Sequence, residues 1–299
     1  MQAAEGSSSS LTELVAFRAR DGVVLRGERW AAGPNTVLLL HGGGQSRWSW
    51  RGTGAALGAA GLTAITLDLR GHGDSDWAVG GGYALEDFAL DVLDVIGQLP
   101  STPALVGASL GGVASLLASA HAPQPRVPAV VLVDIVAHNS SAGIARISSF
   151  MRATVGGFAT LDDAAQAIAD YLPQRARRAP SEGLARTLRR AADGRWVWRW
   201  DPALLDAAFA TEAVHAAPRL VDAATRLHAP CLIVRGGASD VVSREAAESL
   251  ASAVPGSEHA VVEGAAHTVA GDRNDSFTAV VVDFLQRRSL WDGSGARSG

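Results

Sequence analysis

Ser109 lies in a sequence pattern that predicts a nucleophile. It is the central residue of a G-x-S-x-G motif, Gly107 to Gly111, which follows an apolar run and precedes a small-residue helical pattern. A serine at a sharp turn between a strand and a helix exposes its Oγ at the helix N-terminus. We expect glycine at positions 107 and 111 because strand and helix approach too closely there for a side chain. Such a hydroxyl can attack a carbonyl carbon.

The motif also occurs in plain strand-to-helix turns, so the prediction needs a base and an acid later in the chain. His267 follows the last predicted strand, 260–262, in a run of small residues and is the expected general base. Asp240 follows the strand 231–234 in a glycine-rich loop and is the preferred acid. Asp134, at the end of the strand 129–133, is the alternative acid. The order serine, acid, histidine is that of a nucleophile-elbow enzyme.

Two other histidines also lie near predicted strand ends. His72 belongs to a turn crowded with glycine and aspartate, residues 68–76, and precedes the serine in the chain. We interpret it as a structural turn residue. His138 follows the strand 129–133, and we expect it at the entrance to an inserted lid.

A glycine-rich loop, His41 to Gly44, supplies the remaining catalytic part. It follows the apolar strand 35–40. A tetrahedral intermediate needs backbone N–H groups directed at its oxyanion, and we expect these from Gly43 and Leu110. Phosphate binding is a weak alternative, because no Lys-Ser, Lys-Thr or G-x-G-x-x-G spacing accompanies the loop.

Apolar strands alternate with helical patterns along the chain, which predicts an α/β fold. A hairpin, 15–20 and 23–30, opens the series, and six further strands give a mostly parallel eight-stranded sheet flanked by helices. Between 137 and 227 only helical patterns appear: 161–172, 182–192 and 202–216. We therefore expect a disordered leader (1–12), a core domain (13–136 and 228–290), an inserted helical cap or lid (137–227) and a disordered tail (291–299).

Composition limits the kinds of molecule that the protein is expected to bind. The 299 residues carry a formal net charge of −4, which gives no electrostatic footprint for nucleic acid. The single cysteine, Cys231, lies in an apolar strand pattern and is expected to be a small buried residue. We expect no signal peptide, because the first residues lack a basic region and an apolar region, and no apolar stretch approaches the length of a membrane span. The sequence predicts a cytoplasmic monomer or homodimer that binds neither membrane nor nucleic acid.

Aromatic residues indicate what the substrate could be. Trp196, Trp198 and Trp200 alternate along the chain and would share one side of an extended segment. Together with Trp48 and Phe150 they are candidate substrate-binding residues, which would make the substrate small and hydrophobic. Packing of the insertion against the core is the alternative interpretation.

The assembled pattern resembles the cap-bearing branch of the α/β-hydrolase superfamily, which includes epoxide hydrolases, haloalkane dehalogenases, lactonases and carbon–carbon hydrolases. The resemblance covers about 15–285 and is carried by 41–44, Trp50, 68–75, 107–112, Asp240 and His267. Epoxide hydrolases and dehalogenases of this branch use an aspartate nucleophile, whereas this chain has Ser109.

The resemblance therefore implies a serine esterase or lactonase that forms an acyl-enzyme and needs no cofactor or metal. A hydrolase acting on the carbon–carbon bond of a β-diketone or vinylogous ketone is an alternative, because the same triad serves both. A slow-turnover, receptor-like ligand-binding protein is a second alternative.

Overall fold

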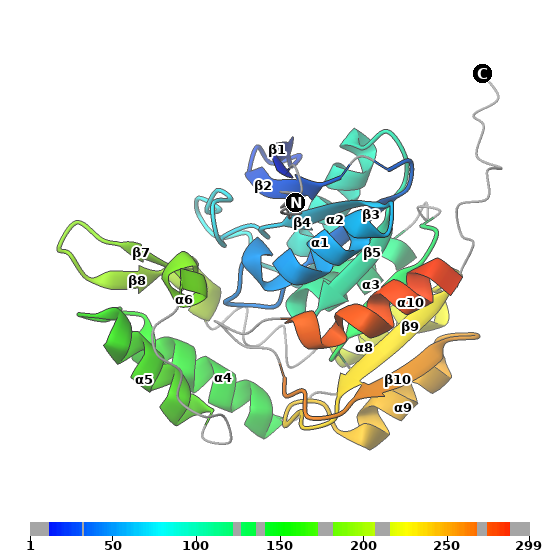
Figure 1. Ribbon diagram of the computed structural model, residues 1–299. Helices are drawn as coiled ribbons and strands as arrows, with labels where there is room; N and C mark the ends of the chain where they lie inside the picture. The colour runs from blue at the N-terminus through cyan, green and yellow to red at the C-terminus, as the bar shows by residue number, and fades with distance from the viewer. Residues whose placement is uncertain are drawn as a thin grey trace, which may run out of the picture.

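An eight-stranded sheet forms the centre of the computed structural model, which describes residues 12–31, 33–121, 127–135, 141–172, 182–206, 216–267 and 274–287. The strand order is β1-β2-β4-β3-β5-β6-β9-β10 (Figure 1). The strands are β1 (Thr12–Arg18), β2 (Val24–Trp30), β3 (Thr36–Leu40), β4 (Thr63–Leu67), β5 (Ala104–Ala108), β6 (Val130–Val133), β9 (Cys231–Gly236) and β10 (Glu258–Val262).

Six neighbouring strands, β4 to β10 in the sheet order, run parallel. The hairpin β1–β2 is antiparallel and joins β4 antiparallel. Gly22, with φ +94°, makes the hairpin turn. The prediction of a mostly parallel eight-stranded α/β sheet is confirmed.

Helices cover both faces of the sheet. On one face lie the 3₁₀ turn η1 (Arg47–Trp50), α1 (Arg51–Ala59) and α10 (Thr278–Arg287). On the other lie α2 (Leu85–Gln98), α3 (Leu110–Ala120), α8 (Ala217–Thr225) and α9 (Arg244–Ala253) (Figure 1). Along β3, Leu38 and Leu40 join one apolar cluster, while Val37 and Leu39 join the other. A strand buried on both faces has no polar side to show, hence its continuous apolar sequence.

The chain between β6 and β9 leaves the sheet and forms an insertion, which lies to one side of the core in Figure 1. It contains α4 (Ser141–Thr154), α5 (Leu161–Tyr171), α6 (Glu182–Thr187), β7 (Leu188–Arg190), β8 (Trp196–Trp198) and the 3₁₀ turn η2 (Pro202–Leu205). After these, α8 packs against α3 on the sheet.

The expectation that this segment holds only helices is wrong. The predicted helix 182–192 ends at Thr187, because Leu188 to Arg190 pair antiparallel with Trp196 to Trp198. Gly194, with φ +84°, turns the chain between these strands. Tryptophan and valine favour such paired, half-buried strands. Of the predicted helix 202–216, residues 207–215 lie outside the described residues.

The chain ends also carry predictions. The predicted leader 1–12 and tail 291–299 lie outside the described residues, except that Thr12 begins β1. In the described part of the chain, no helix is long and apolar enough to cross a membrane.

Candidate active site

Ser109 occupies a strained turn between β5 and α3. Its backbone has φ +47° and ψ −117°, a conformation that costs a non-glycine residue about 1–3 kcal/mol. Its N–H donates to the Val133 carbonyl of the neighbouring strand at 3.0 Å. A Cβ placed on Gly107 would lie 2.3 Å from the Gly111 carbonyl oxygen, so the expected reason for Gly107 is confirmed. A Cβ on Gly111 would instead lie 2.4 Å from the Leu40 carbonyl oxygen, at the end of β3. The strained turn holds Ser109 at the carboxyl end of β5.

Asp134 is the acid that contacts His267. The imidazole Nδ1 donates to Asp134 Oδ2 at 2.5 Å, and both side chains are buried. Asp134 directly follows Val133, whose carbonyl binds the Ser109 N–H, so the Asp134–His267 pair lies beside the turn that holds the serine.

The prediction of Asp240 as the orienting acid is wrong. Its exposed carboxylate instead forms an ion pair with Arg146 of the insertion at 2.8 Å. Asp134, the sequence alternative, has the place that Asp240 was expected to fill. Because β6 and β9 are parallel neighbours, the loops after both strands reach the same edge of the sheet, and strand position alone does not distinguish their carboxylates.

Two further groups hold the Asp134 carboxylate, and sequence reasoning missed both. The Gly236 N–H donates to Oδ1 at 3.0 Å, and the Ser239 hydroxyl donates to Oδ2 at 2.7 Å. Asp134 itself has φ +51°, a left-handed conformation that aspartate tolerates better than most residues. The only sequence signal for this arrangement is an aspartate placed directly after a buried strand.

The glycine-rich loop lies against the serine turn. A Cβ on Gly42 would be 3.3 Å from Ser109 Cβ, and one on Gly43 would be in ordinary contact with Leu110 at 3.8 Å. The Gly42 N–H donates to Gln45 Oε1 at 2.9 Å, and the Gly44 N–H donates to His72 Nε2 at 3.1 Å. Within the described residues, the N–H groups of Gly43 and Leu110 have no acceptor. The role of these two N–H groups as oxyanion donors stays a prediction.

His41 and His72 are buried beneath this loop. Each ring donates from Nδ1 to a backbone carbonyl at 2.8 Å, of Gly42 and Arg70 respectively. His41 Nε2 accepts from the Leu69 N–H at 3.0 Å, as His72 Nε2 does from Gly44. Burial lowers the pKa of His41 to about 4 and that of His72 to about 3. Both rings are therefore neutral structural groups at neutral pH, as the turn interpretation of His72 requires.

Residues 35–273 match the family model described as alpha/beta hydrolase fold. The chain belongs to this family. It is 30% identical to Esterase Rv0045c of Mycobacterium tuberculosis, over 87% of this chain and 86% of that protein. It is 32% identical to the 2-(acetamidomethylene)succinate hydrolase of Mesorhizobium japonicum, over 70% and 73%.

A solved structure of E-2-(acetamidomethylene)succinate hydrolase superposes with a TM-score of 0.76 at 25% identity. The superposition covers 92% of this chain and all of the other. Because the relatives are esterases and other hydrolases, the chain is an enzyme that catalyses hydrolysis. The predictions of family, fold and enzyme class are confirmed.

Ion pairs and backbone hydrogen bonds join the insertion of this α/β-hydrolase to its core. Asp74 accepts from Arg47 at 2.8 Å and from Arg199 of the insertion at 2.6 Å, and Arg47 also pairs with buried Asp68. The Gly73 N–H donates to the Arg199 carbonyl at 2.7 Å. The turn after β4 therefore binds the insertion on one side and, through His72, the glycine-rich loop on the other.

Another buried bond secures the same junction. The Tyr83 hydroxyl donates to Asp201 of the insertion at 2.5 Å, and the Asp201 N–H donates to the Gly71 carbonyl at 2.8 Å. Burial and the bond to Asp201 raise the pKa of Tyr83, so the phenol keeps its proton.

The aromatic residues predicted to bind substrate lie in different parts of the structure. Phe150 stacks on Tyr171 with ring centroids 4.4 Å apart and meets Trp198 edge-on at 6.2 Å, inside the insertion. Trp198 is buried and donates to Thr154. Trp200 is buried where the insertion pairs with His72. For Trp200 this contact agrees with the interpretation that the insertion packs against the core, whereas Phe150 and Trp198 pack within the insertion itself.

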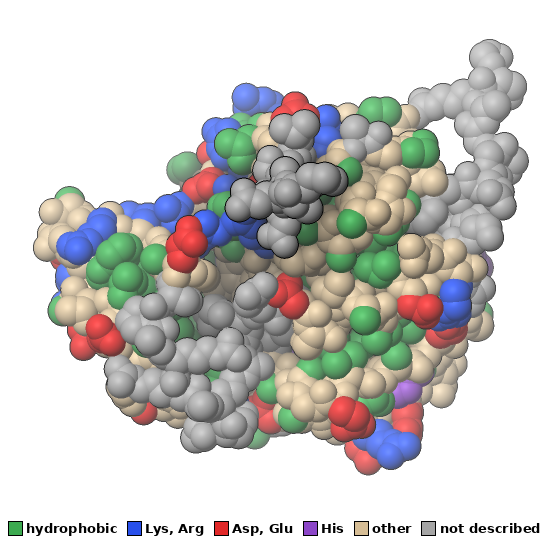
Figure 2. All heavy atoms as spheres, viewed as in Figure 1, with side chains coloured by type: hydrophobic (Ala, Val, Ile, Leu, Met, Phe, Trp, Pro, Cys, Tyr) green, Lys and Arg blue, Asp and Glu red, His purple; other side chains and the backbone are tan. Residues whose placement is uncertain are grey.

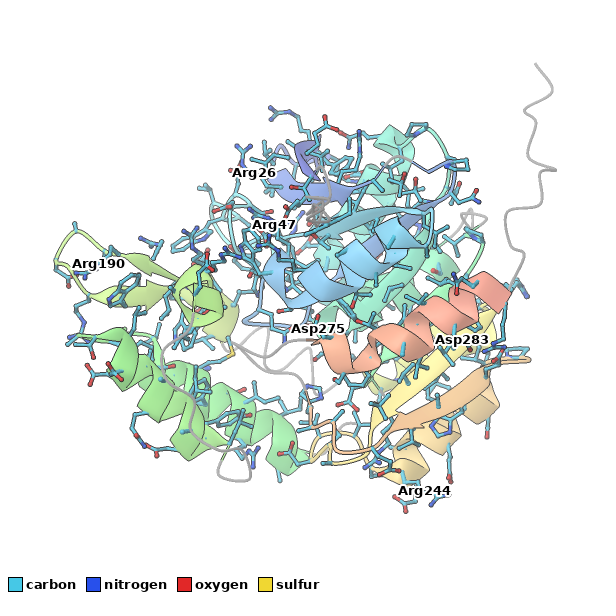
Figure 3. All side chains as sticks on the ribbon, in the orientation of Figure 1. Arg26, Arg47, Arg190, Arg244, Asp275 and Asp283 are labelled. Carbon is cyan, nitrogen blue, oxygen red and sulfur yellow. The ribbon has the colours of Figure 1, made fainter. Side chains whose placement is uncertain are left out.

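Trp48 and Trp196 are half-buried and contact arginines. The Trp48 ring lies 4.7–5.2 Å from three guanidinium groups, those of Arg47, Arg51 and Arg186. Arg190 lies 4.8 Å from the Trp196 ring. Figure 2 shows basic side chains over the hairpin β7–β8 and the adjoining core, and Figure 3 labels Arg190 and Arg47 in these two regions. A substrate role for Trp48 and Trp196 stays a prediction.

The remaining candidates are a histidine and the single cysteine. His138 lies outside the described residues. Burial raises the pKa of the Cys231 thiol to about 12, so this cysteine is not a thiolate nucleophile. Among the described residues, no group of three or more His, Cys, Asp or Glu side chains is arranged to hold a metal ion.

Proposed function

We propose that this hydrolase cleaves a carboxylic ester or lactone of a small hydrophobic molecule through an acyl-enzyme on Ser109. The observation that carries the proposal is the 2.5 Å bond from His267 to Asp134, buried beside the strained turn that presents the serine. A carboxylate on Nδ1 fixes the imidazole tautomer that leaves Nε2 free to accept a proton.

Acylation follows from these roles. Ser109 Oγ attacks the substrate carbonyl carbon while His267 takes the hydroxyl proton, and Asp134 stabilises the resulting imidazolium. The N–H groups of Gly43 and Leu110 stabilise the oxyanion of the tetrahedral intermediate. When the intermediate collapses, His267 gives its proton to the departing alkoxide, which leaves as an alcohol. In a lactone the alcohol stays joined to the acyl group.

Deacylation repeats the sequence with water. His267 removes a proton from water, the hydroxide attacks the acyl carbonyl carbon, and the second tetrahedral intermediate releases the carboxylic acid. The proton returns to Ser109. The net reaction adds one water across the ester bond and needs no cofactor.

The relatives support this reaction class. One is named an esterase, and the other is named for 2-(acetamidomethylene)succinate. A substrate panel should therefore contain p-nitrophenyl butyrate, a γ-lactone, 2-(acetamidomethylene)succinate and a β-diketone, which represents the carbon–carbon alternative. Preference for the diketone over the esters would contradict the proposed substrate class. A cytoplasmic monomer or homodimer without membrane or nucleic-acid partners stays a prediction.

The variant Ser109→Ala tests the mechanism. Removal of the nucleophile should lower kcat by more than about 10⁴-fold and leave the fold intact, because triad members act as a unit. A fluorophosphonate probe should label the wild-type protein at Ser109 alone, as mapped by peptide mass spectrometry.

Ser119→Ala is a matched control, because among the described residues the Ser119 hydroxyl bonds only to the Ser115 carbonyl of its own helix. It should hydrolyse p-nitrophenyl butyrate at the wild-type rate. Turnover by Ser109→Ala at a similar rate, or labelling elsewhere, would reject Ser109 as the nucleophile.

A further inference from the structure

We infer that Ser239 is a positioning residue that acts through Asp134 to set how strongly His267 holds its proton. The inference rests on the proposed function, because it assigns His267 as the base. Ser239 was not among the predicted site residues. It directly precedes Asp240, which was expected to be the acid.

The Ser239 hydroxyl has a fixed direction. Its oxygen accepts from the Val242 N–H at 3.2 Å, and its own proton is donated to Asp134 Oδ2 at 2.7 Å. A hydroxyl that both accepts and donates is held in one orientation. The bond to a carboxylate is charge-assisted and therefore stronger than a bond between neutral groups.

The Ser239 hydroxyl bonds to the same carboxylate oxygen of Asp134 as His267 does. Asp134 Oδ2 receives both Ser239 Oγ and His267 Nδ1, whereas Oδ1 receives the Gly236 N–H at 3.0 Å. A donor on Oδ2 stabilises part of the carboxylate charge. Less of that charge then remains to stabilise a protonated imidazole. Ser239 should therefore make His267 release its proton more readily.

Backbone bonds hold the Ser239 loop against the segment that carries His267. The Gly237 N–H donates to the Val262 carbonyl and the Ala238 N–H to the Ala265 carbonyl, both at 2.8 Å. A Cβ on Gly236 would lie 2.6 Å from the Ala265 oxygen, which shows how closely the two segments approach. The hydroxyl, the carboxylate and the imidazole thus come from segments that these backbone bonds hold together.

Other charged groups lie around these segments and are unchanged by substitution of Ser239. The Arg235 guanidinium donates to the carbonyls of Val242, Gly237 and Ser239. The Glu263 carboxylate lies near Gly237, and Asp240 pairs with Arg146. A change in pH dependence on loss of the hydroxyl is therefore attributable to the bonds of the hydroxyl itself, of which the one to Asp134 reaches the partner of His267.

The test compares kcat/KM for p-nitrophenyl butyrate from pH 5 to 9 in the wild type and Ser239→Ala. Without the hydroxyl, Asp134 stabilises the imidazolium more strongly, so the midpoint of the acid limb should rise by about 0.5 pH unit. Below pH 6, kcat/KM should therefore fall by about threefold, with a smaller loss at pH 8. The rate of fluorophosphonate labelling at Ser109 should shift in the same way.

Two further variants separate positioning from plain structural loss. Ser239→Thr keeps the hydroxyl and should return the acid limb to its wild-type position. Ser239→Cys, a weaker donor of similar size, should give a smaller shift and keeps the test usable if the alanine variant does not fold. Asp240→Asn is the matched control, because its exposed side chain does not contact Asp134, and its acid limb should stay in place.

The outcomes are distinguishable from failure of the proposed function. An acid limb that does not move in Ser239→Ala would overturn this inference, whether or not activity falls. A shift of equal size in Ser239→Thr would also overturn it. Absence of probe labelling at Ser109 in the wild type would instead reject the proposed function.

Discussion

Two buried histidine sites lie at the carboxyl edge of the sheet, and they use their imidazole rings differently. In the Asp134–His267 pair, one ring nitrogen faces a carboxylate oxygen. In the His41–His72 pair, which lies beneath the glycine-rich loop with ring centroids 5.0 Å apart, all four ring nitrogens bond to backbone groups.

The difference lies in how each site treats a positive charge. Burial among backbone dipoles disfavours a charged ring and lowers the pKa of His41 to about 4 and that of His72 to about 3. A carboxylate beside His267 offers a counter-charge when the ring takes a proton. A buried histidine at a strand end is thus a candidate base when a carboxylate holds one nitrogen, and a structural group when the backbone holds both.

Between the two histidine sites, the largest expected effect comes from removing the counter-charge of His267. Asp134→Asn should lower kcat for p-nitrophenyl butyrate by about 10⁴-fold, because the amide neither fixes the tautomer nor stabilises the imidazolium. Steady-state kinetics at pH 8 measures the loss, and circular dichroism checks that the fold is retained.

The matched control for this prediction is Asp240→Asn. Within the described part of the chain its carboxylate makes only an exposed ion pair with Arg146, a class of contact that contributes about 0–1 kcal/mol to stability. The kcat of this variant should stay within about twofold of the wild type. If Asp240→Asn lost activity and Asp134→Asn kept it, the assignment of the acid would be reversed.

The contrast between these aspartates marks the limit of sequence-based prediction here. The alternation of apolar strands and helices predicted all eight strands of the central sheet, and the G-x-S-x-G spacing placed Ser109 in its turn. His267 was found because it follows the last strand. These features depend on local pattern and chain order, which a sequence carries directly.

Side-chain pairing across the sheet edge does not follow from such patterns. Asp134 and Asp240 follow adjacent parallel strands, and the choice between them depends on which loop turns toward His267. The Ser239 bond and the hairpin β7–β8 depend on the same tertiary packing. The run Trp196 to Trp198 does not by itself indicate which segment pairs with it.

A second prediction concerns Gly43, in the glycine-rich loop that lies against the His41–His72 pair. If the Gly43 N–H binds the oxyanion, Gly43→Pro, which removes that donor, should lower kcat by about 10²–10³-fold. Gly43→Ala keeps the N–H, and its added Cβ would meet Leu110 only at ordinary contact distance. Kinetics with p-nitrophenyl butyrate should therefore show a minor effect for alanine. Equal losses in both variants would indicate a general disturbance of the loop and contradict the donor role.

The smallest expected effect concerns stability and pH. The pKa of His72 is lowered to about 3 in the folded state, against about 6.5 when unfolded. As pH falls below about 6.5, the unfolded chain gains a proton that the folded chain does not, so this histidine's contribution makes folding less favourable. His72→Gln does not titrate at this position. Between pH 6 and 4.5, the free energy of unfolding of this variant should fall by about 2 kcal/mol less than that of the wild type.

Urea unfolding of the wild type and His72→Gln at pH 7, 6, 5 and 4.5 measures this difference. Burial raises the pKa of Asp91 to about 6, which changes stability in the opposite direction, but it does so in both proteins and cancels in the comparison. Because glutamine retains an acceptor for the Gly44 N–H, kcat should fall only about threefold. Parallel stability curves for the wild type and His72→Gln would show that His72 titrates alike in both states, and the distinction between the two histidine sites would fail.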